Sequence, residues 1–312
     1  ETFNSLKKYN INAMPEYSIE AESSVQGFEN YKKDSIEIIN FLGKQGLPFI
    51  AIKCTGLLDI DSLEKISSGE YSYDSMEYTS FKQRLVELCD SAVENNVQVL
   101  IDAEETWIQD AIDKVAVELM GIYNKKSTII FLTHQCYRRG TLSKIKKDMK
   151  VSAQKKYYYG IKLVRGAYME KERKRALQNG YKSPIQPSKE RTDNEYNESL
   201  KYSIKSIDSA SLWVGSHNEE SSLYLMNLMQ ENNLKPQDKR VWFSQLYGMS
   251  DNISYALSSL GYNIVKLIPF GPIEKTIPYL IRRANENSSV KGQSNRQFTL
   301  IKNEINRRKN LN

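Results

Sequence analysis

The sequence contains few of the residues that build metal centres and disulfide frameworks. Among 312 residues there are three cysteines and two histidines. Cys54, Cys89 and Cys136 form neither a CxxC motif nor a cysteine–histidine pattern. This argues against a disulfide framework and a zinc site, and it favours a reducing compartment. We therefore expect no metal site in this protein.

Long hydrophobic runs and a strong charge imbalance are also lacking. No apolar run approaches the roughly 18–20 residues that a membrane-spanning helix needs, and no signal-peptide pattern follows Glu1. The net charge is +6, and the one basic cluster lies in a tail from about residue 300 onward. Nucleic-acid-binding proteins usually carry a denser basic patch, so we do not expect nucleic acid as a partner.

What is present is an alternation of short apolar runs with amphipathic stretches. Apolar residues recur at helical spacing in residues 81–96, 106–120 and 196–207. Eight strands alternating with helices predict a parallel sheet, and eight is the number that closes a (β/α)8 TIM barrel. One such barrel can fill residues 1–312 as a single domain. A doubly wound open sheet is the alternative, although no strand is followed by GxGxxG. The expected strands are 10–14, 47–53, 97–102, 128–133, 159–164, 211–216, 241–245 and 263–268.

Polar residues close six apolar runs in succession. A single polar strand end is ordinary, because strands usually stop at polar residues. In a barrel, however, the active residues lie at the carboxyl ends of the strands. The series therefore predicts a charged pocket at one mouth of the barrel. Its members are Lys53, Asp102, Gln135, Lys162 with Arg165, Ser216 with His217, and Gln245.

Lys53 and Asp102 are candidates for a buried ion pair. A lysine at the end of a buried strand is costly unless it is paired, and Asp102 is the natural partner if the two strands are neighbours. Asp102 could instead cap a helix that begins near Thr106. Because Glu104 and Glu105 follow at once, the sequence leaves the roles of these three carboxylates open.

Lys162 and Arg165 lie three residues apart in "GIKLVRGAY". Alternation along a strand puts them on opposite sides, so one faces the barrel interior and the other the helix layer. Gly166 and Ala167 then allow close backbone approach to a flat or phosphorylated group. The stretch is compatible with a large anionic cofactor.

Arg282 and Arg283 follow the last strand in a helical pattern, and Glu286 lies three residues beyond Arg283. Arg283 and Glu286 could form a surface ion pair, or the two guanidinium groups could receive a small carboxylate.

Two classes of enzyme remain open from the residues alone. One is an aldolase-type lyase in which Lys53 or Lys162 forms a Schiff base. The other is a cofactor-dependent oxidoreductase acting on a carboxylated substrate. A non-catalytic barrel that binds anions ranks third.

Six long motifs in order closely resemble the proline dehydrogenase family, of the short, monofunctional type. They are "AIKCTG", "IDAEETWIQDAID", "GIKLVRGAYMEKER", "GSHNEESS", "FSQLYGMSDNIS" and "IPFGPIEKTIPYLIRRANENSSV". The similarity extends over nearly the whole chain from about Tyr17. It implies a distorted (β/α)8 barrel that binds FAD and oxidises L-proline to Δ1-pyrroline-5-carboxylate. A hydride passes to the flavin N5 and the electrons pass to a membrane quinone.

The resemblance also implies partners and places in the cell. Functional coupling to a pyrroline-5-carboxylate dehydrogenase is one expectation. The protein would be cytoplasmic or peripheral at the inner membrane in a bacterium, and mitochondrial in a eukaryote. A hydroxyproline dehydrogenase of the same fold is an alternative activity.

Residue roles follow from the same resemblance. Lys53, Asp102 and Lys162 are the expected catalytic residues, with Lys162 near the flavin ring. The implied substrate pocket consists of Lys53, Tyr168, Leu246, Leu267, Tyr279, Arg282 and Arg283. The implied cofactor contacts are Ala103, Gln135, Lys162, Arg165, Gly166, Ala167, Ser216, His217 and Glu286.

The sequence departs from the family pattern at several positions, among them Phe270, which replaces a frequent tyrosine. Leu267 stands where proline enzymes commonly carry a tyrosine. The order Lys-Leu-Val-Arg at 162–165 replaces the Arg-Leu-Val-Lys that is common in bifunctional relatives.

Overall fold

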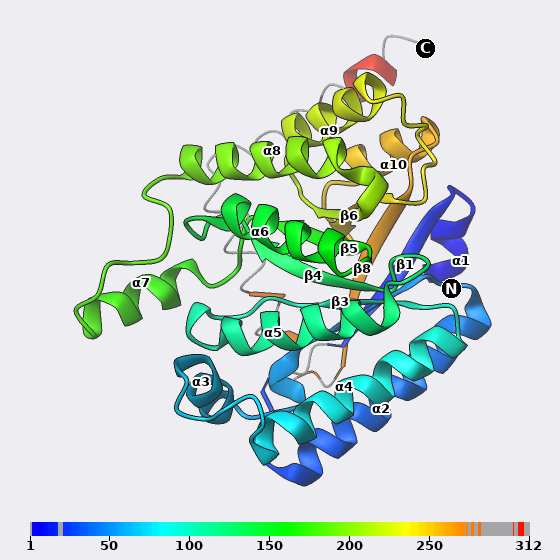
Figure 1. Cartoon of the computed structure of the whole chain (residues 1–312). Helices are drawn as coiled ribbons and strands as arrows, with labels where there is room; N and C mark the ends of the chain where they lie inside the picture. Colours follow the sequence, from blue (N-terminus) through cyan, green and yellow to red (C-terminus); the bar gives the residue numbers. More distant parts are fainter. Residues whose placement is uncertain are drawn as a thin grey trace.

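Eight parallel strands form the centre of the molecule, and helices surround them (Figure 1). The computed structural model describes residues 2–17 and 21–271, together with 273, 276, 277, 280, 281, 302 and 305–308. The strands are β1 Ile11–Tyr17, β2 Phe49–Ile52, β3 Gln98–Ile101, β4 Ile130–Gln135, β5 Tyr159–Val164, β6 Ala210–Gly215, β7 Val241–Leu246 and β8 Ile264–Phe270.

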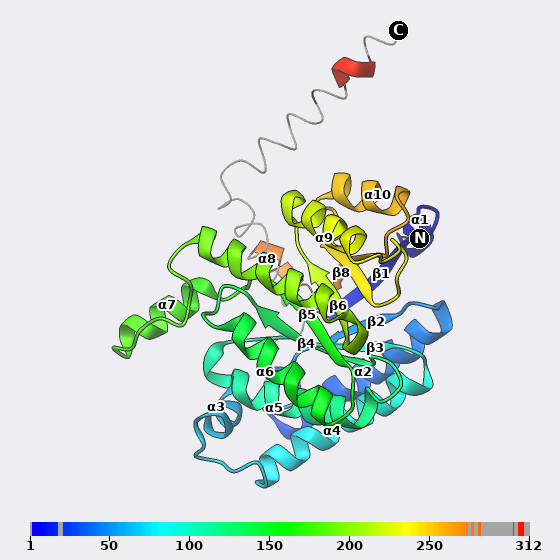
Figure 2. The same ribbon diagram turned by 45° about the horizontal axis from the view of Figure 1, so that its top comes forward.

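Helices connect successive strands and cover the outside of the sheet (Figures 1 and 2). Helix α7 projects away from the barrel in both views. The α-helices are α1 Thr2–Lys7, α2 Val25–Gln45, α3 Ile60–Ser68, α4 Met76–Glu94, α5 Thr106–Tyr123, α6 Thr141–Gln154, α7 Met169–Gln178, α8 Lys189–Lys205, α9 Glu219–Glu231 and α10 Asp251–Ser259. Short 3₁₀ turns occupy Cys54–Gly56 and Ile207–Ser209.

The strand order is that of a barrel. Each strand pairs with the next one in the chain from β2 to β8, and β8 pairs with β1, so the first and last strands are neighbours. Ile11 pairs with Ile264 at the start of this last ladder. Within the described residues, β1 and β2 contact each other without a ladder of hydrogen bonds. This arrangement confirms the (β/α)8 barrel and excludes the doubly wound sheet.

The sheet contributes side chains to two apolar cores, one on its outer face and one in the barrel interior. The larger lies between the strands and the helices, where the outward side chains pack on the amphipathic helix faces. The smaller fills the barrel interior with large side chains, so the barrel is a packed core and not a pore. A pocket can therefore open only where this filling ends. The interior core consists of Met14, Phe49, Ala51, Leu100, Phe131, Trp213 and Val265.

Most of the expected elements are present within a few residues of their predicted positions. The strand expected at 10–14 begins at Ile11 and continues to Tyr17. The asparagine pair 95–96 ends α4, because Asn95 is its C-cap residue. Helix α7 has a highly charged sequence and buries only Glu172 and Ala176. No described helix has the length and hydropathy needed to cross a membrane.

Candidate functional site

A cavity of about 320 Å³ opens at the carboxyl ends of the strands. Every described residue that was expected in the site from its sequence lines this cavity. Tyr279, Arg282, Arg283 and Glu286 lie outside the described residues. The residues that the fold brings together are Lys53, Asp102, Ala103, Gln135, Lys162, Arg165, Gly166, Ala167, Tyr168, Ser216, His217, Gln245, Leu246 and Leu267.

Two lysines share one carboxylate on the floor of the cavity. Lys53 Nζ lies 3.1 Å from Asp102 Oδ2, and Lys162 Nζ lies 2.5 Å from Asp102 Oδ1. The three side chains are at most 9% exposed. Asp102 does not cap α5, because the N-cap residue of that helix is Glu105. The expected partnership of Lys53 with Asp102 follows from the pairing of β2 with β3.

The neighbouring charges determine the protonation states of Asp102 and Lys53. Burial alone would raise the pKa of Asp102, but the ammonium groups of Lys162 and Lys53 hold it well below its ordinary value. Burial alone would lower the pKa of Lys53, and Asp102 instead raises it well above its ordinary value. Lys53 is therefore an ammonium ion at neutral pH.

Glu104 supports the turn that follows Lys53. Its carboxylate accepts hydrogen bonds from the Thr55 backbone N–H at 3.1 Å and from Thr55 Oγ1 at 2.6 Å. Its backbone carbonyl accepts a bond from Gln135 Nε2 at 2.8 Å. Glu104 thus joins the ends of β2, β3 and β4. Burial raises its pKa to about 7.

We expect Glu104 to make stability depend on pH. Its folded-state pKa of about 7 exceeds the ordinary value of 4.5. The folded state therefore binds more protons than the unfolded state between these values, and stability falls as pH rises. Between pH 5 and pH 8 the wild type should lose roughly 2–3 kcal/mol more than Glu104→Gln. Urea unfolding of both proteins at the two pH values measures this difference, and parallel pH profiles would contradict it.

Helix α7 is fastened to the start of α5. Thr106 donates from its backbone N–H and its hydroxyl to the buried Glu172 carboxylate at 2.6 and 2.7 Å. Lys171 forms an ion pair with Glu105. Tyr168 immediately precedes α7 and lines the cavity. These contacts hold the rim of the cavity on which Tyr168 lies.

Arg165 faces the helix layer, as strand alternation predicts. Its guanidinium group donates to Asp193 Oδ1 at 2.6 Å and to the hydroxyls of Ser216 and Ser221 at 3.0 Å each. It also lies over the ring of Tyr196, 4.4 Å from the ring centre. Lys162, on the opposite side of β5, faces the barrel interior.

Amide side chains tie neighbouring strand ends together. Gln135 Oε1 accepts a hydrogen bond from the Ala167 N–H at 3.2 Å. Gln245 Nε2 donates to the Ser216 carbonyl at 3.2 Å, and Ser254 donates to Gln245 Oε1 at 2.8 Å. The cavity wall is therefore held by side-chain bonds as well as by the ladders.

The cavity also includes residues that were not expected from the sequence. Thr133, Lys162 and Trp213 lie in one row across β4, β5 and β6. Thr133 Oγ1 and Trp213 Nε1 are buried and have no hydrogen-bond partner among the described residues. Both line the cavity and could donate to a ligand. Thr133 follows Leu132 and Trp213 precedes Val214, so these positions look apolar in the sequence. The period of two along each strand could have placed both side chains in the barrel interior. The other lining residues that were not expected are Glu16, Val164, Lys189, Gly215, Asn218 and Ser244.

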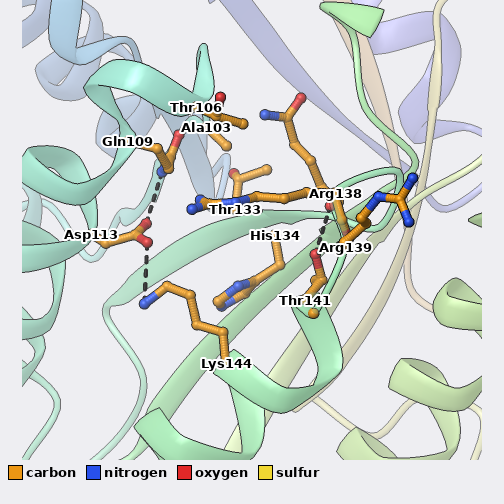
Figure 3. Close-up of a pocket in the computed structure, with 12 residues that line it drawn as sticks. Ala103, Thr106, Gln109, Asp113, Thr133, His134, Arg138, Arg139, Thr141 and Lys144 are labelled. Carbon is orange, nitrogen blue, oxygen red and sulfur yellow. Dashed lines mark hydrogen bonds and ion pairs between the residues drawn. The ribbon is translucent and has the colours of Figure 1, made fainter. Parts of the chain in front are cut away.

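A second, smaller cavity of about 110 Å³ lies behind this wall, between β4, α5 and α6 (Figure 3). Asp113 lies at its edge, where it accepts from Gln109 at 2.8 Å and pairs with Lys144 at 3.1 Å. Burial lowers the pKa of His134 to about 3, so this ring is neutral. Ala103, Thr133 and Gln135 line both cavities.

Comparisons with known proteins agree with this geometry. The family model described as "Proline dehydrogenase" matches residues 1–296. The chain is 34% identical to "Proline dehydrogenase 1, mitochondrial" of Caenorhabditis elegans over 93% of its own length and 48% of that protein. It is 37% identical to "Hydroxyproline dehydrogenase" of Xenopus laevis over 78% of its own length and 52% of that protein. The chain thus spans about half the length of these relatives.

The fold has a close counterpart among solved structures. Proline utilization A from Bdellovibrio bacteriovorus, in a form inactivated by N-propargylglycine, matches with a TM-score of 0.84. The match covers 93% of this chain and 31% of that one at 22% identity, which supports the fold alone. The sequence matches show the family as well as the fold, because they extend through the strands that carry the cavity. The chain therefore belongs to the proline dehydrogenase family.

Proposed function

We propose that this protein oxidises L-proline to Δ1-pyrroline-5-carboxylate with FAD as its cofactor. The observation that carries the proposal is the buried Asp102 held between Lys53 and Lys162 at the carboxyl ends of the strands. Asp102 lies at the C-terminal mouth of the barrel, where barrel enzymes bind their substrates. The family membership supplies the class of reaction.

The residues present fit a flat, anionic cofactor. Thr133 Oγ1 and Trp213 Nε1 offer unused donors beside Lys162, and a flavin ring carries several acceptor atoms. A Cβ at Gly166 would lie 2.4 Å from the Tyr137 ring, so the backbone here is fitted to its neighbours. Lys189 and His217 add donors at the outer part of the cavity. Acceptance of a hydride and delivery of the electrons to a membrane quinone is the chemistry that FAD supplies when bound.

The protein's own residues would orient the substrate and stabilise charge. Asp102 keeps Lys53 in place beside the substrate, and the positive charge of Lys162 stabilises the negative charge that develops on reduction. Tyr168, Leu246 and Leu267 form walls around a small ring. We propose that Arg282 and Arg283, with Tyr279, hold the substrate carboxylate, and that Glu286 contributes to the cofactor site.

An aldolase-type mechanism that uses Lys53 is disfavoured by the charge state of this lysine. Schiff-base formation needs a neutral amine. Asp102 raises the pKa of Lys53 well above its ordinary value, so the nucleophilic form is scarce.

The test is a spectrum of the purified, FAD-loaded protein before and after anaerobic addition of L-proline. We expect proline to bleach the flavin absorbance. A folded, flavin-loaded protein that proline cannot reduce would refute the proposed activity. Anaerobic addition of a quinone analogue to the proline-reduced protein then tests the acceptor, because a quinone that accepts the electrons should restore the flavin absorbance. For localisation we propose the mitochondrion if the source is eukaryotic, as the names of the relatives indicate.

Hydroxyproline is the second candidate substrate, because Leu267 lines the cavity where a tyrosine would crowd the proline ring. Leucine is shorter, and an apolar wall rejects an added hydroxyl by no more than about a hundredfold. We therefore expect Leu267→Tyr to raise the ratio of kcat/KM for proline to that for 4-hydroxyproline by roughly tenfold or more. Leu246→Met is a matched control on the neighbouring strand, in register with Leu267. An unchanged ratio in Leu267→Tyr would show that this side chain does not face the substrate.

A further inference from the structure

A fully buried lysine lies in β8, outside the set of residues assigned to the site. The Lys266 side chain is 1% exposed. Its neighbours Val265 and Leu267 belong to the barrel interior, so Lys266 points outward, toward α10. A buried ammonium group is costly unless polar groups surround it, and these groups reveal what it holds.

The partners of Lys266 all belong to the connection between β7 and α10. Its Nζ donates to the carbonyl of Met249 at 2.6 Å and to the carbonyl of Leu246 at 3.3 Å. It also pairs with Asp251 Oδ1 at 2.8 Å. Burial lowers the pKa of Lys266, and Asp251 opposes this effect. One side chain thus fixes the start, the middle and the end of a short connection.

Ser250 lies between two of these fixed points. Its φ of 51° is in the left-handed region, which disfavours residues other than glycine unless the surroundings impose it. Met249 and Asp251, on either side, are both held by Lys266. In this conformation the Ser250 hydroxyl lies 2.9 Å from His217 Nδ1. His217 lines the cavity.

We infer that Lys266 is a positioning residue for His217. It imposes the left-handed conformation of Ser250, and the Ser250 hydroxyl in turn fixes the ring of His217 at the cavity. The same lysine holds the carbonyl of Leu246, whose side chain forms part of the wall. If the proposed function is correct, the consequence is that a residue with no contact to the cofactor sets the cofactor affinity.

Histidine NMR tests the geometric part without any cofactor. The chain has only two histidines, so the ¹⁵N side-chain spectrum contains two sets of signals, and His217→Gln assigns them. In Lys266→Met we expect the His217 signals and their titration to move to those of Ser250→Ala. The His217 signals of the double variant Lys266→Met/Ser250→Ala should match those of either single variant. The His134 signals should stay unchanged in all three proteins. A His217 spectrum identical to that of the wild type in Lys266→Met would overturn the inference.

A matched control separates positioning from a general loss of stability. Ile264 is a fully buried residue on the same outward face of β8. Ile264→Val should lower the melting temperature and leave the His217 signals unchanged. Movement of the His217 signals by the same amount in Ile264→Val would show that any damage to β8 is sufficient, and would overturn the assignment.

FAD titration of the apoprotein tests the consequence. We expect the dissociation constant to rise roughly tenfold in Lys266→Met and no further in the double variant with Ser250→Ala, as for supporting residues around other buried sites. Additive losses would overturn the pathway through Ser250. A wild-type protein that binds no FAD would instead count against the proposed function, and the NMR result would still decide the role of Lys266.

Discussion

Replacing Asp102 with asparagine should lower the free energy of unfolding by about 3–5 kcal/mol, because two buried ammonium groups lose the carboxylate with which both pair. The amide would also present donors to at least one lysine. The loss should shrink as pH rises, since Lys53 can then release its proton and become neutral. Proline-dependent flavin reduction should fall at least about a hundredfold, as expected when a preorganised charge is lost from a site. Urea unfolding at pH 7 and pH 9.5, with stopped-flow reduction, measures both effects.

Glu118 provides a matched control for this variant. Its carboxylate also lies between two lysines, with Lys82 at 2.8 Å and Lys114 at 2.9 Å, but all three side chains are partly exposed. Exposed pairs contribute little, so Glu118→Gln should cost less than about 1 kcal/mol and leave reduction unchanged. Equal losses at the two positions would contradict the importance given to burial at Asp102.

Gly166→Ala is expected to have the second large effect, roughly 2–5 kcal/mol of stability. The φ of Gly166 is 132°, which strains any residue with a side chain. The added Cβ would also lie 2.4 Å from Tyr137 Cδ1. Tyr137 cannot withdraw easily, because its ring is buried and its backbone N–H bonds to the Arg165 carbonyl. Overpacking therefore adds to the backbone strain. FAD retention should fall as well.

Gly140→Ala isolates the backbone contribution. Gly140 also has a positive φ, 80°, but a Cβ there would meet no atom within 4 Å. It should cost only about 1–2 kcal/mol. Thermal or urea unfolding of both variants gives the comparison. If the two alanines cost the same, the contact with Tyr137 is unimportant.

The strands and the charged mouth could be predicted from the sequence because each rests on a local pattern. Apolar runs mark the strands. Lys53 and Asp102 each follow such a run directly, and Gln135 follows the end of the expected strand 128–133 by two residues. The partnership of Lys53 and Asp102 required only that consecutive strands be neighbours, and the barrel supplies this. The placement of Lys162 and Arg165 on opposite sides of β5 followed from the period of two.

Other features depend on contacts between distant segments. The three carboxylates after β3 look alike in sequence, yet Asp102 binds lysines, Glu104 binds Thr55 and Glu105 binds Lys171. Lys266 interrupts an apolar strand, which was a signal of function, but its partners lie in a turn before β8 that no period describes. Helix α7 is stabilised by hydrogen bonds between Glu172 and Thr106 at the start of α5, and these partners could not be predicted from the sequence.

The ladder between the first and last strands has a consequence for biosynthesis. β1 is hydrogen-bonded only to β8 in the described sheet, and Ile11 pairs with a residue that the ribosome adds about 250 positions later. During translation β1 therefore cannot form its ladder, and both of its edges stay unpaired, until nearly the whole barrel sequence has left the ribosome. Such distant pairing slows folding and leaves strand edges open to aggregation. The nascent chain should consequently depend on chaperones most during the interval before β8 leaves the exit tunnel.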